Sequence, residues 1–149
     1  MPTVRGCILP DDLLYDVDNN LWYRPESDGT YTVGMTMVAI AMAGKLVAFT
    51  AKKAGKTIAA GKSCATIESG KWVGPAKLGF TAEIVAVNDN LSGEPTLANS
   101  DTYGDGWMVR VKPEDPAEAT ALLTKGPDVA GPYEAKMTAD EFAGCAAWA

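Results

Sequence analysis

Short apolar segments separated by polar turn residues dominate the first two thirds of the chain. They are five or six residues long, rich in Val, Ile, Thr, Phe or Ala, and predict β-strands at Thr30–Gly34, Leu46–Ala51, Ser63–Ile67, Glu83–Val87 and Trp107–Lys112. In the last of these, Trp107, Val109 and Val111 occupy every second position, so one side of the strand is expected to be buried and the other solvent-facing. The pattern is typical of a mainly β fold, with residues 1–20 as an edge or a cover.

Three segments predict short helices instead. Met35–Ala43 is apolar throughout, and its Ala and Met content, with Gly44 as a stop signal, favours a helix that is either covered core or partly an exposed docking face. Asp115, Pro116 and Glu118 form a helix start before Ala119–Leu123. The Lys125–Tyr133 segment, with two Gly-Pro pairs, predicts a loop, and a second capping pattern at Thr138–Glu141 predicts a final helix at Phe142–Trp148.

Length, charge and composition restrict the classes of function that the chain can have. The 149 residues fit one domain, and we find no linker that would divide them. A formal net charge of −6 argues against a nucleic-acid-binding protein, which needs clustered Lys and Arg. The chain has no histidine, so catalytic triads built on imidazole are excluded and a hydrolytic zinc site is not expected. These features indicate a protein that presents a group to enzymes and is not an enzyme itself.

Cysteine usage and hydropathy bear on the compartment. Cys7, Cys64 and Cys145 are odd in number and widely spaced, which predicts three free thiols in a reducing cytoplasm, with Cys64 buried and inert. The N-terminus lacks the apolar core of a signal peptide. The most apolar stretch, Met35–Ala43, is much shorter than the roughly 20 residues that span a bilayer. We therefore expect a cytoplasmic protein that does not enter a membrane.

The candidate functional residue is Lys71, in the segment Glu68-Ser69-Gly70-Lys71-Trp72. A predicted strand runs into a Ser-Gly turn, which would place this lysine at the tip of a hairpin. Most lysines in turns are simply solvated charges. A primary amine on a flexible four-carbon stem, beside small residues, is nevertheless what a ligase needs to attach a cofactor arm.

Several spaced motifs in this region resemble the H-protein of the glycine cleavage system. The resemblance extends from about Leu21 to Lys112, and Glu68, Ser69 and Lys71 match the family's Glu-Ser-x-Lys around its modified lysine. Gly44 and Gly55 match family glycines. The other matching blocks are Val33-Gly34-Met35-Thr36, Val87-Asn88-Asp89-Asn90-Leu91, Pro95-Thr96-Leu97-Ala98-Asn99 and Tyr103-Gly104-Asp105-Gly106-Trp107.

This resemblance implies a fold and a cofactor. The fold would be a flattened β-barrel or sandwich of the lipoyl-carrier type (barrel-sandwich hybrid) with short flanking helices. The core would cover about residues 21–112, and a helical segment would follow at about 115–149 of one domain, 1–149. Lipoate would be attached covalently to Lys71 and act as a swinging arm. The implied partners are a lipoate ligase or lipoyl-transfer machinery, dihydrolipoamide dehydrogenase and client enzymes, with no nucleic acid and no membrane.

Departures from the family pattern bear on the clients. The family's charged helix is replaced by the apolar Met37–Met42, and its Ala-Ser-Asp run after the lysine by Trp72–Pro75. In these features the chain is similar to the H-protein-like lipoate-binding proteins of the heterodisulfide-reductase-like sulfur-oxidation system. The client would then be a sulfur-handling complex, with aminomethyl transfer in glycine cleavage as the alternative. A biotin carrier, whose lysine lies between methionines, and an unmodified interaction module are further alternatives. Trp72 is expected either to pack on the hairpin or to shield the arm.

Overall fold

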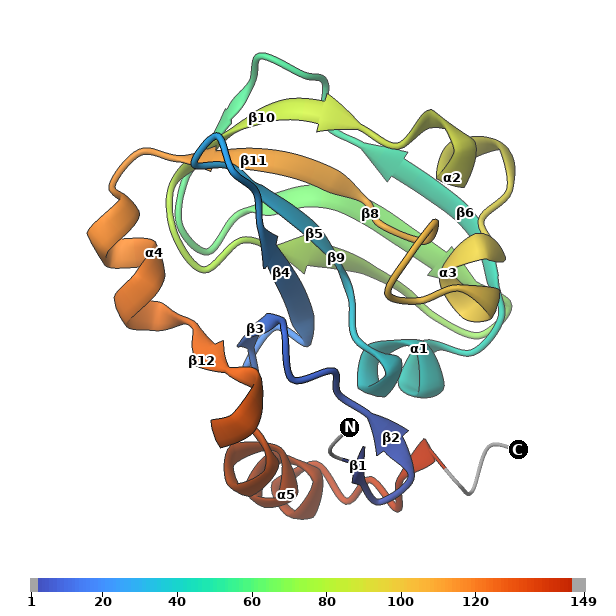
Figure 1. The fold of residues 1–149 in the computed structure, drawn as a ribbon. Helices are drawn as coiled ribbons and strands as arrows, with labels where there is room; N and C mark the ends of the chain where they lie inside the picture. The colour runs from blue at the N-terminus through green and yellow to red at the C-terminus, as the bar shows by residue number, and fades with distance from the viewer. Residues whose placement is uncertain (1–2, 146–149) are drawn as a thin grey trace.

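Two facing β-sheets form the main layers of the protein (Figure 1). The computed structural model describes residues 3–145. The larger sheet has seven strands in the order β12-β3-β4-β5-β11-β10-β7, and the smaller has three in the order β6-β8-β9. All strand pairs are antiparallel. Within the described residues the sheets do not join into a closed barrel, so the fold is a flattened barrel-sandwich, as predicted.

The strand boundaries agree closely with the hydropathy pattern. The larger sheet contains β3 (Leu14–Asp16), β4 (Leu21–Pro25), β5 (Tyr31–Met35), β7 (Thr57–Ile58), β10 (Ala82–Val87), β11 (Val109–Pro113) and β12 (Thr124–Lys125). The smaller sheet contains β6 (Leu46–Ala51), β8 (Ser63–Ser69) and β9 (Val73–Lys77). All five predicted strands are present, with shifts of at most two residues at an end. In β11, Val109 and Val111 are fully buried, as the alternation predicted, but Trp107 and Met108 lie before the strand, and Met108 is buried although the alternation placed it on the solvent side.

Two hydrophobic clusters stabilise this arrangement. The first fills the space between the sheets with residues such as Tyr23, Phe49 and Ile67. The second includes Trp22 and Tyr133, and it joins the larger sheet to the N-terminal segment and the C-terminal helix. The first segment of the chain therefore acts as a cover, one of the two predicted roles, whereas its strand β3 lies between β12 and β4 and is not an edge strand of the larger sheet.

Helix α1 (Met37–Ala43) follows β5 directly and is mainly covered core. Thr36 begins the helix because its side chain accepts a hydrogen bond from the backbone N–H of Ala39 (3.3 Å). Gly44 ends it with a φ of 87°, a conformation that favours glycine. Val38, Ile40, Ala41 and Ala43 are buried. Two shorter helices, α2 (Asp89–Gly93) and α3 (Leu97–Ser100), lie before β11.

The C-terminal third is helical, but its second helix is not where the sequence predicted it. Helix α4 (Pro116–Leu122) begins at Asp115 as expected. After the 3-10 turn η1 (Gly126–Asp128), helix α5 (Ala130–Ala139) occupies part of the predicted loop. Pro132 is tolerated because it lies in the first turn, where backbone N–H groups have no intrahelical acceptor. The predicted helix at Phe142–Trp148 is wrong for residues 142–144, which are not helical, and residues 146–148 lie outside the described part.

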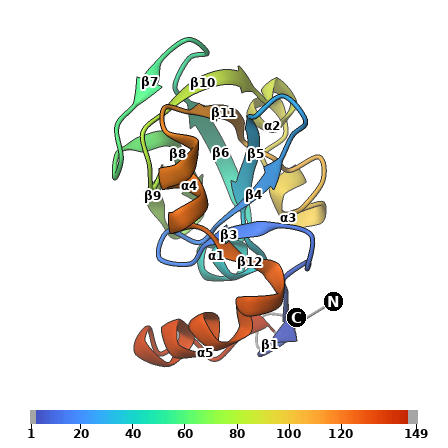
Figure 2. The ribbon, with the colours of Figure 1, turned by 60° about the vertical axis from the view of Figure 1, so that its left-hand side comes forward.

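The prediction of three free thiols is wrong, because Cys7 and Cys145 form a disulfide. Cys7 begins strand β2 (Cys7–Ile8), which pairs with β1 (Thr3–Val4). Arg5, in the turn between these strands, binds Glu134 of α5 through its guanidinium group (2.7 Å). We call the β1–β2 hairpin, the disulfide and α5 the terminal clasp; Figure 2 shows α5 and β1 together at one end of the molecule. Because Cys7 and Cys145 are paired, the cysteines no longer support a reducing compartment, and the cytoplasmic location stays a prediction.

Cys64 is the free cysteine of the described residues, and it is buried, as predicted. Burial raises the pKa of its thiol to about 12, so the reactive thiolate is scarce at neutral pH. Within residues 3–145, no helix combines the length and hydrophobicity needed to cross a membrane.

Candidate functional site

Lys71 lies at the apex of the hairpin that joins β8 to β9, as the sequence predicted, and it is exposed. The turn is closed by the Ser69 backbone N–H, which donates to the Trp72 carbonyl (2.7 Å). The Lys71 backbone N–H donates in turn to the Ser69 hydroxyl (3.3 Å). Ser69 is itself buried, so these bonds fix the base of the turn while the Lys71 side chain lies outside the fold.

The sequence of β8 explains why the turn forms at this point. Cys64, Ala65, Ile67 and Ser69 face the interior, whereas Thr66 and Glu68 face solvent. Gly70 follows directly, and a Cβ atom there would meet nothing within 4 Å. The lysine therefore has a small, uncrowded residue on its N-terminal side, which leaves room for an enzyme to approach it.

Trp72 packs onto the hairpin, which was the first of the two expectations for this residue. A Cβ atom at Gly74 would clash with the Trp72 ring, so the ring lies directly over this glycine. Trp72 is still 41% exposed. Its ring also forms one wall of a pocket, so packing on the hairpin is compatible with the other expectation, that Trp72 shields the predicted cofactor arm.

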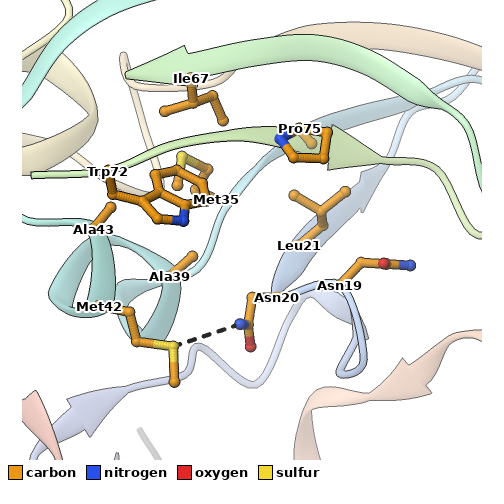
Figure 3. Close-up of a pocket in the computed structure, with 11 residues that line it drawn as sticks. Asn19, Asn20, Leu21, Met35, Ala39, Met42, Ala43, Ile67, Trp72 and Pro75 are labelled. Carbon is orange, nitrogen blue, oxygen red and sulfur yellow. Dashed lines mark hydrogen bonds between the residues drawn. The ribbon is translucent and has the colours of Figure 1, made fainter. Parts of the chain in front are cut away.

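The pocket is a cavity of about 230 Å³ that begins beside Trp72 (Figure 3). Its other walls come from five elements and one turn: Leu21 of β4, Met35 of β5, Ala39, Met42 and Ala43 of α1, Ile67 of β8, Pro75 and Ala76 of β9, and Asn19 and Asn20 before β4. The Asn20 amide is turned toward the Met42 sulfur, at 3.9 Å. None of these lining residues has an ionisable side chain, so the pocket suits an apolar, uncharged group.

Two of the sequence motifs fix the turns around this pocket. The Asn99 side chain accepts from the Leu46 backbone N–H and donates to the Gly44 carbonyl, both at 3.0 Å, and so holds the turn between α1 and β6. The Tyr103 hydroxyl accepts from the Met37 N–H (3.0 Å) and donates to the Ile8 carbonyl (2.5 Å), which anchors the start of α1. The motifs thus stabilise the frame of the site through their contacts with Gly44, Leu46, Met37 and Ile8.

Asn88, in a third motif, plays a similar role farther from the hairpin. Its side-chain oxygen accepts from the Asn90 N–H (3.2 Å) and begins α2, while its amide nitrogen donates to the carbonyls of Asp105 and Trp107 (both 2.8 Å). It therefore ties α2 to the segment that enters β11. Among residues 3–145, no group of three Cys, Asp or Glu side chains is arranged to hold a metal ion.

Comparison with known proteins gives a consistent answer. The sequence model of the family described as "Glycine cleavage H-protein" matches residues 13–132. The chain belongs to the glycine cleavage H-protein family. The H-protein fold expected for this family is also the fold observed: a crystal structure of a glycine cleavage system H protein from Mycobacterium marinum superposes with a TM-score of 0.71 at 32% identity. That match covers 83% of this chain and 97% of the other.

Curated relatives support the family and show that it has several members in one organism. "Glycine cleavage system H protein 5" of Aquifex aeolicus is 52% identical over 126 residues, covering 83% of this chain and 85% of the relative. "Glycine cleavage system H protein 2" of the same organism is 44% identical over 109 residues, covering 73% and 68%. "Probable glycine cleavage system H protein 2" of Sulfurisphaera tokodaii is 40% identical over 126 residues, covering 83% and 85%.

Sequence reasoning predicted the position of Lys71 at the hairpin apex but not the pocket beside it. Asn19 comes from the segment predicted as an edge or a cover, and Met35, Ala39 and Met42 come from the predicted helix Met35–Ala43. The available signal was the replacement of charged family residues by apolar ones in Met37–Met42 and Trp72–Pro75. Both segments contribute to the pocket, so these departures lie together on one surface.

Proposed function

We propose that this H-protein is a non-catalytic lipoyl carrier, folded as one domain with its core at about residues 21–112, and that lipoate is attached to Lys71. The observation that carries the proposal is an exposed lysine at the apex of a hairpin whose base is fixed by Ser69. Membership in the lipoyl-carrying H-protein family supports it. The partners are a ligase or transfer enzyme that attaches the arm, dihydrolipoamide dehydrogenase and a client complex.

The residues of the hairpin fit this cofactor. Lipoate, joined to the Lys71 amine by an amide bond, supplies a dithiolane that can be reduced and loaded with a transferred group. The turn at Ser69–Trp72 holds the attachment point away from the body. Trp72, the next residue, leads from the attachment point into the apolar pocket, where Met35 and Met42 can contact sulfur-containing groups. The pocket can therefore hold the end of the arm away from water between clients.

We propose further that the client is a heterodisulfide-reductase-like sulfur-oxidation complex. The absence of ionisable side chains among the described pocket residues favours an uncharged carried group. A protonated aminomethyl group, the cargo in glycine cleavage, would lose hydration there without a carboxylate to pair with. The several numbered H proteins of Aquifex aeolicus support the idea that family members within one organism serve different clients.

Glycine cleavage is the second candidate, and it has at least as much support from the names of the relatives. Incubation of the lipoylated protein with glycine decarboxylase, glycine and pyridoxal phosphate distinguishes the two. We expect little aminomethyl transfer to the arm, whereas a conventional H protein run in parallel is loaded efficiently. Transfer at the rate of that control would contradict the sulfur-oxidation role.

The attachment site is tested by intact mass spectrometry of protein from its native source. We expect the mass of one lipoyl group on wild-type protein and none on Lys71→Arg, because a guanidinium group is not acylated by a ligase. Lys56→Arg is the matched control, since Lys56 is an exposed lysine in another turn, and it should carry the full adduct. A biotinyl mass, or wild-type protein without an adduct, would contradict the proposal and favour the biotin carrier or the interaction module.

A further inference from the structure

The charges of this chain are strongly separated along the sequence. Residues 45–77 contain seven lysines and one acidic residue, Glu68, a formal charge of +6. The remaining residues carry six basic and eighteen acidic side chains, a formal charge of −12. Residues 45–77 include the whole three-stranded sheet β6-β8-β9, and all seven lysines are exposed. The segment that contains this sheet and Lys71 is therefore positive, whereas the rest of the sequence is negative.

The outer face of this sheet also exposes apolar side chains close to the hairpin apex. Val47 is 54% exposed and Val73 is 60% exposed. Glu68 pairs in register with Ala48 on one side and with Val73 on the other, so both valines lie on the strands that flank it. A shallow groove beside them is lined by Ala43, Gly44, Lys45, Val47, Gly70 and Lys71. Large exposed aliphatic residues gathered in this way are typical of a contact surface.

Lysines border the apolar area at both ends of the sheet. Lys45 lines the groove at the apex end. At the other end, Lys77 pairs in register with Ser63, and the Lys52 backbone N–H donates to the Cys64 carbonyl, so both lie beside the start of β8. We call this surface, with Val47, Val73 and its bordering lysines, the carrier face.

We propose that the carrier face is the docking surface for the enzymes that act on Lys71, and that these enzymes present an apolar rim surrounded by Asp and Glu. The inference rests on the proposed function, because any enzyme that acts on the apex of the hairpin must approach this surface. Opposite charge accelerates encounter and sets orientation, whereas the valines supply buried apolar area. Attachment of lipoate removes one positive charge, so residues 45–77 keep a formal charge of +5 and the surface serves loaded and unloaded protein alike.

The test uses the lipoate ligase of the same organism, with lipoate and ATP, and measures the KM and kcat for the unmodified protein. Lys45→Glu combined with Lys77→Glu reverses two charges on the carrier face. Lys112→Glu combined with Lys125→Glu makes the same charge change on exposed lysines of the larger sheet and is the matched control. Circular dichroism and thermal melting of each variant verify that it is folded.

We expect the carrier-face variant to raise KM about tenfold at low salt with kcat unchanged, and the control to change KM less than about twofold. Raising the salt from roughly 20 to 300 mM should raise the wild-type KM and remove most of the difference, because salt screens exposed charges. A salt-independent KM, or an equal effect of the control pair, would overturn the docking assignment while leaving lipoylation intact. Wild-type protein that the ligase never modifies would overturn the proposed function and this inference together.

Other occupants of the carrier face give different results. The −12 charge of the remaining residues makes a second copy of the chain a possible partner, and sedimentation at low salt would detect it. Self-association that the carrier-face variant abolishes, with an unchanged ligase KM, would replace the enzyme by a second copy. Binding to single-stranded RNA or to phosphatidylserine vesicles, again with an unchanged ligase KM, would also overturn the assignment.

Discussion

The lysine hairpin and the terminal clasp are built in opposite ways. The clasp is held by the Cys7–Cys145 disulfide and by the Arg5 side chain, which donates hydrogen bonds to Glu134, Thr138 and the Phe142 carbonyl. In the hairpin, local bonds between Ser69, Lys71 and Trp72 define the turn, and the neighbouring residues are small or exposed. The clasp is thus held by bonds between residues far apart in the sequence, whereas the hairpin is held by local bonds and leaves Lys71 exposed.

The largest expected effect is a loss of stability when the disulfide of the terminal clasp is removed. Replacing both disulfide cysteines, Cys7→Ser with Cys145→Ser, should lower the free energy of unfolding by about 5 kcal/mol in the chain-entropy description of a loop this long. Urea unfolding followed by circular dichroism measures the loss. The rate of lipoylation of Lys71, measured at a temperature where the variant is folded, should not change.

A fall in that rate would show that the two regions are coupled through α1. The Cys145 sulfur lies 3.7 Å from the Met37 carbonyl at the start of this helix, and Met42 near its end lines the pocket. The disulfide of wild-type protein can also be reduced with a phosphine, which breaks the same bond without a substitution. The lipoylation rate of the reduced protein is then compared with that of the oxidised protein.

A smaller effect is expected from a methyl group placed under Trp72. Gly74→Ala should force the ring from its position and cost about 1–3 kcal/mol, the usual range for overpacking. Gly70→Ala, in the same hairpin, adds a methyl group in open space and should change stability by less than about 0.5 kcal/mol. Thermal unfolding compares the two. Equal stability of both variants would mean that Trp72 is not held against the hairpin.

The same pair of variants also separates packing from shielding of the arm. If Trp72 shields the lipoyl group, Gly74→Ala and Trp72→Ala should both accelerate reduction of the attached arm by a small-molecule reductant. Gly70→Ala should leave that rate unchanged. Constant rates in all three variants would restrict Trp72 to a packing role.

The smallest effect concerns Cys64, which lies in β8 near the end of the hairpin opposite to Lys71. Because burial raises its pKa to about 12, native protein should not react with iodoacetamide between pH 7 and 9, and unfolded, unreduced protein should take up one label. Between the ordinary pKa of about 9 and the raised value, the unfolded chain ionises first, so this group lowers stability as the pH rises. Mass spectrometry counts the labels. Rapid labelling of native protein would indicate that β8 opens readily.

Local patterns in the sequence were sufficient for the strands and for the hairpin. Leu46–Ala51 was predicted at its exact bounds because a short run of apolar and β-forming residues lies between Gly44-Lys45 and Lys52-Lys53. Gly44 and Asp115 marked helix ends through the chemistry of single residues, whereas the helix start at Thr36 was missed because the helix was predicted to begin at Met35. The position of Lys71 followed in the same way, from a Ser-Gly turn after a strand.

Features assembled from distant segments could not be predicted in this way. The disulfide joins residues that are 138 positions apart, and neither cysteine has a neighbour that indicates its partner. The pocket combines residues of five elements, none of which is distinctive alone. Helix α5 was missed for a different reason: Pro132 reads as a helix breaker unless the helix is known to start at Ala130.

The disulfide also changes what a broken peptide bond would do. Because it links the second strand, β2, to the last described residue, the backbone between Cys7 and Cys145 is covalently a ring. A protease that cuts the exposed turn at Gly55 would leave one nicked molecule and not two fragments. The piece that bears Lys71 would remain attached to the rest of the protein until the sulfur–sulfur bond was reduced.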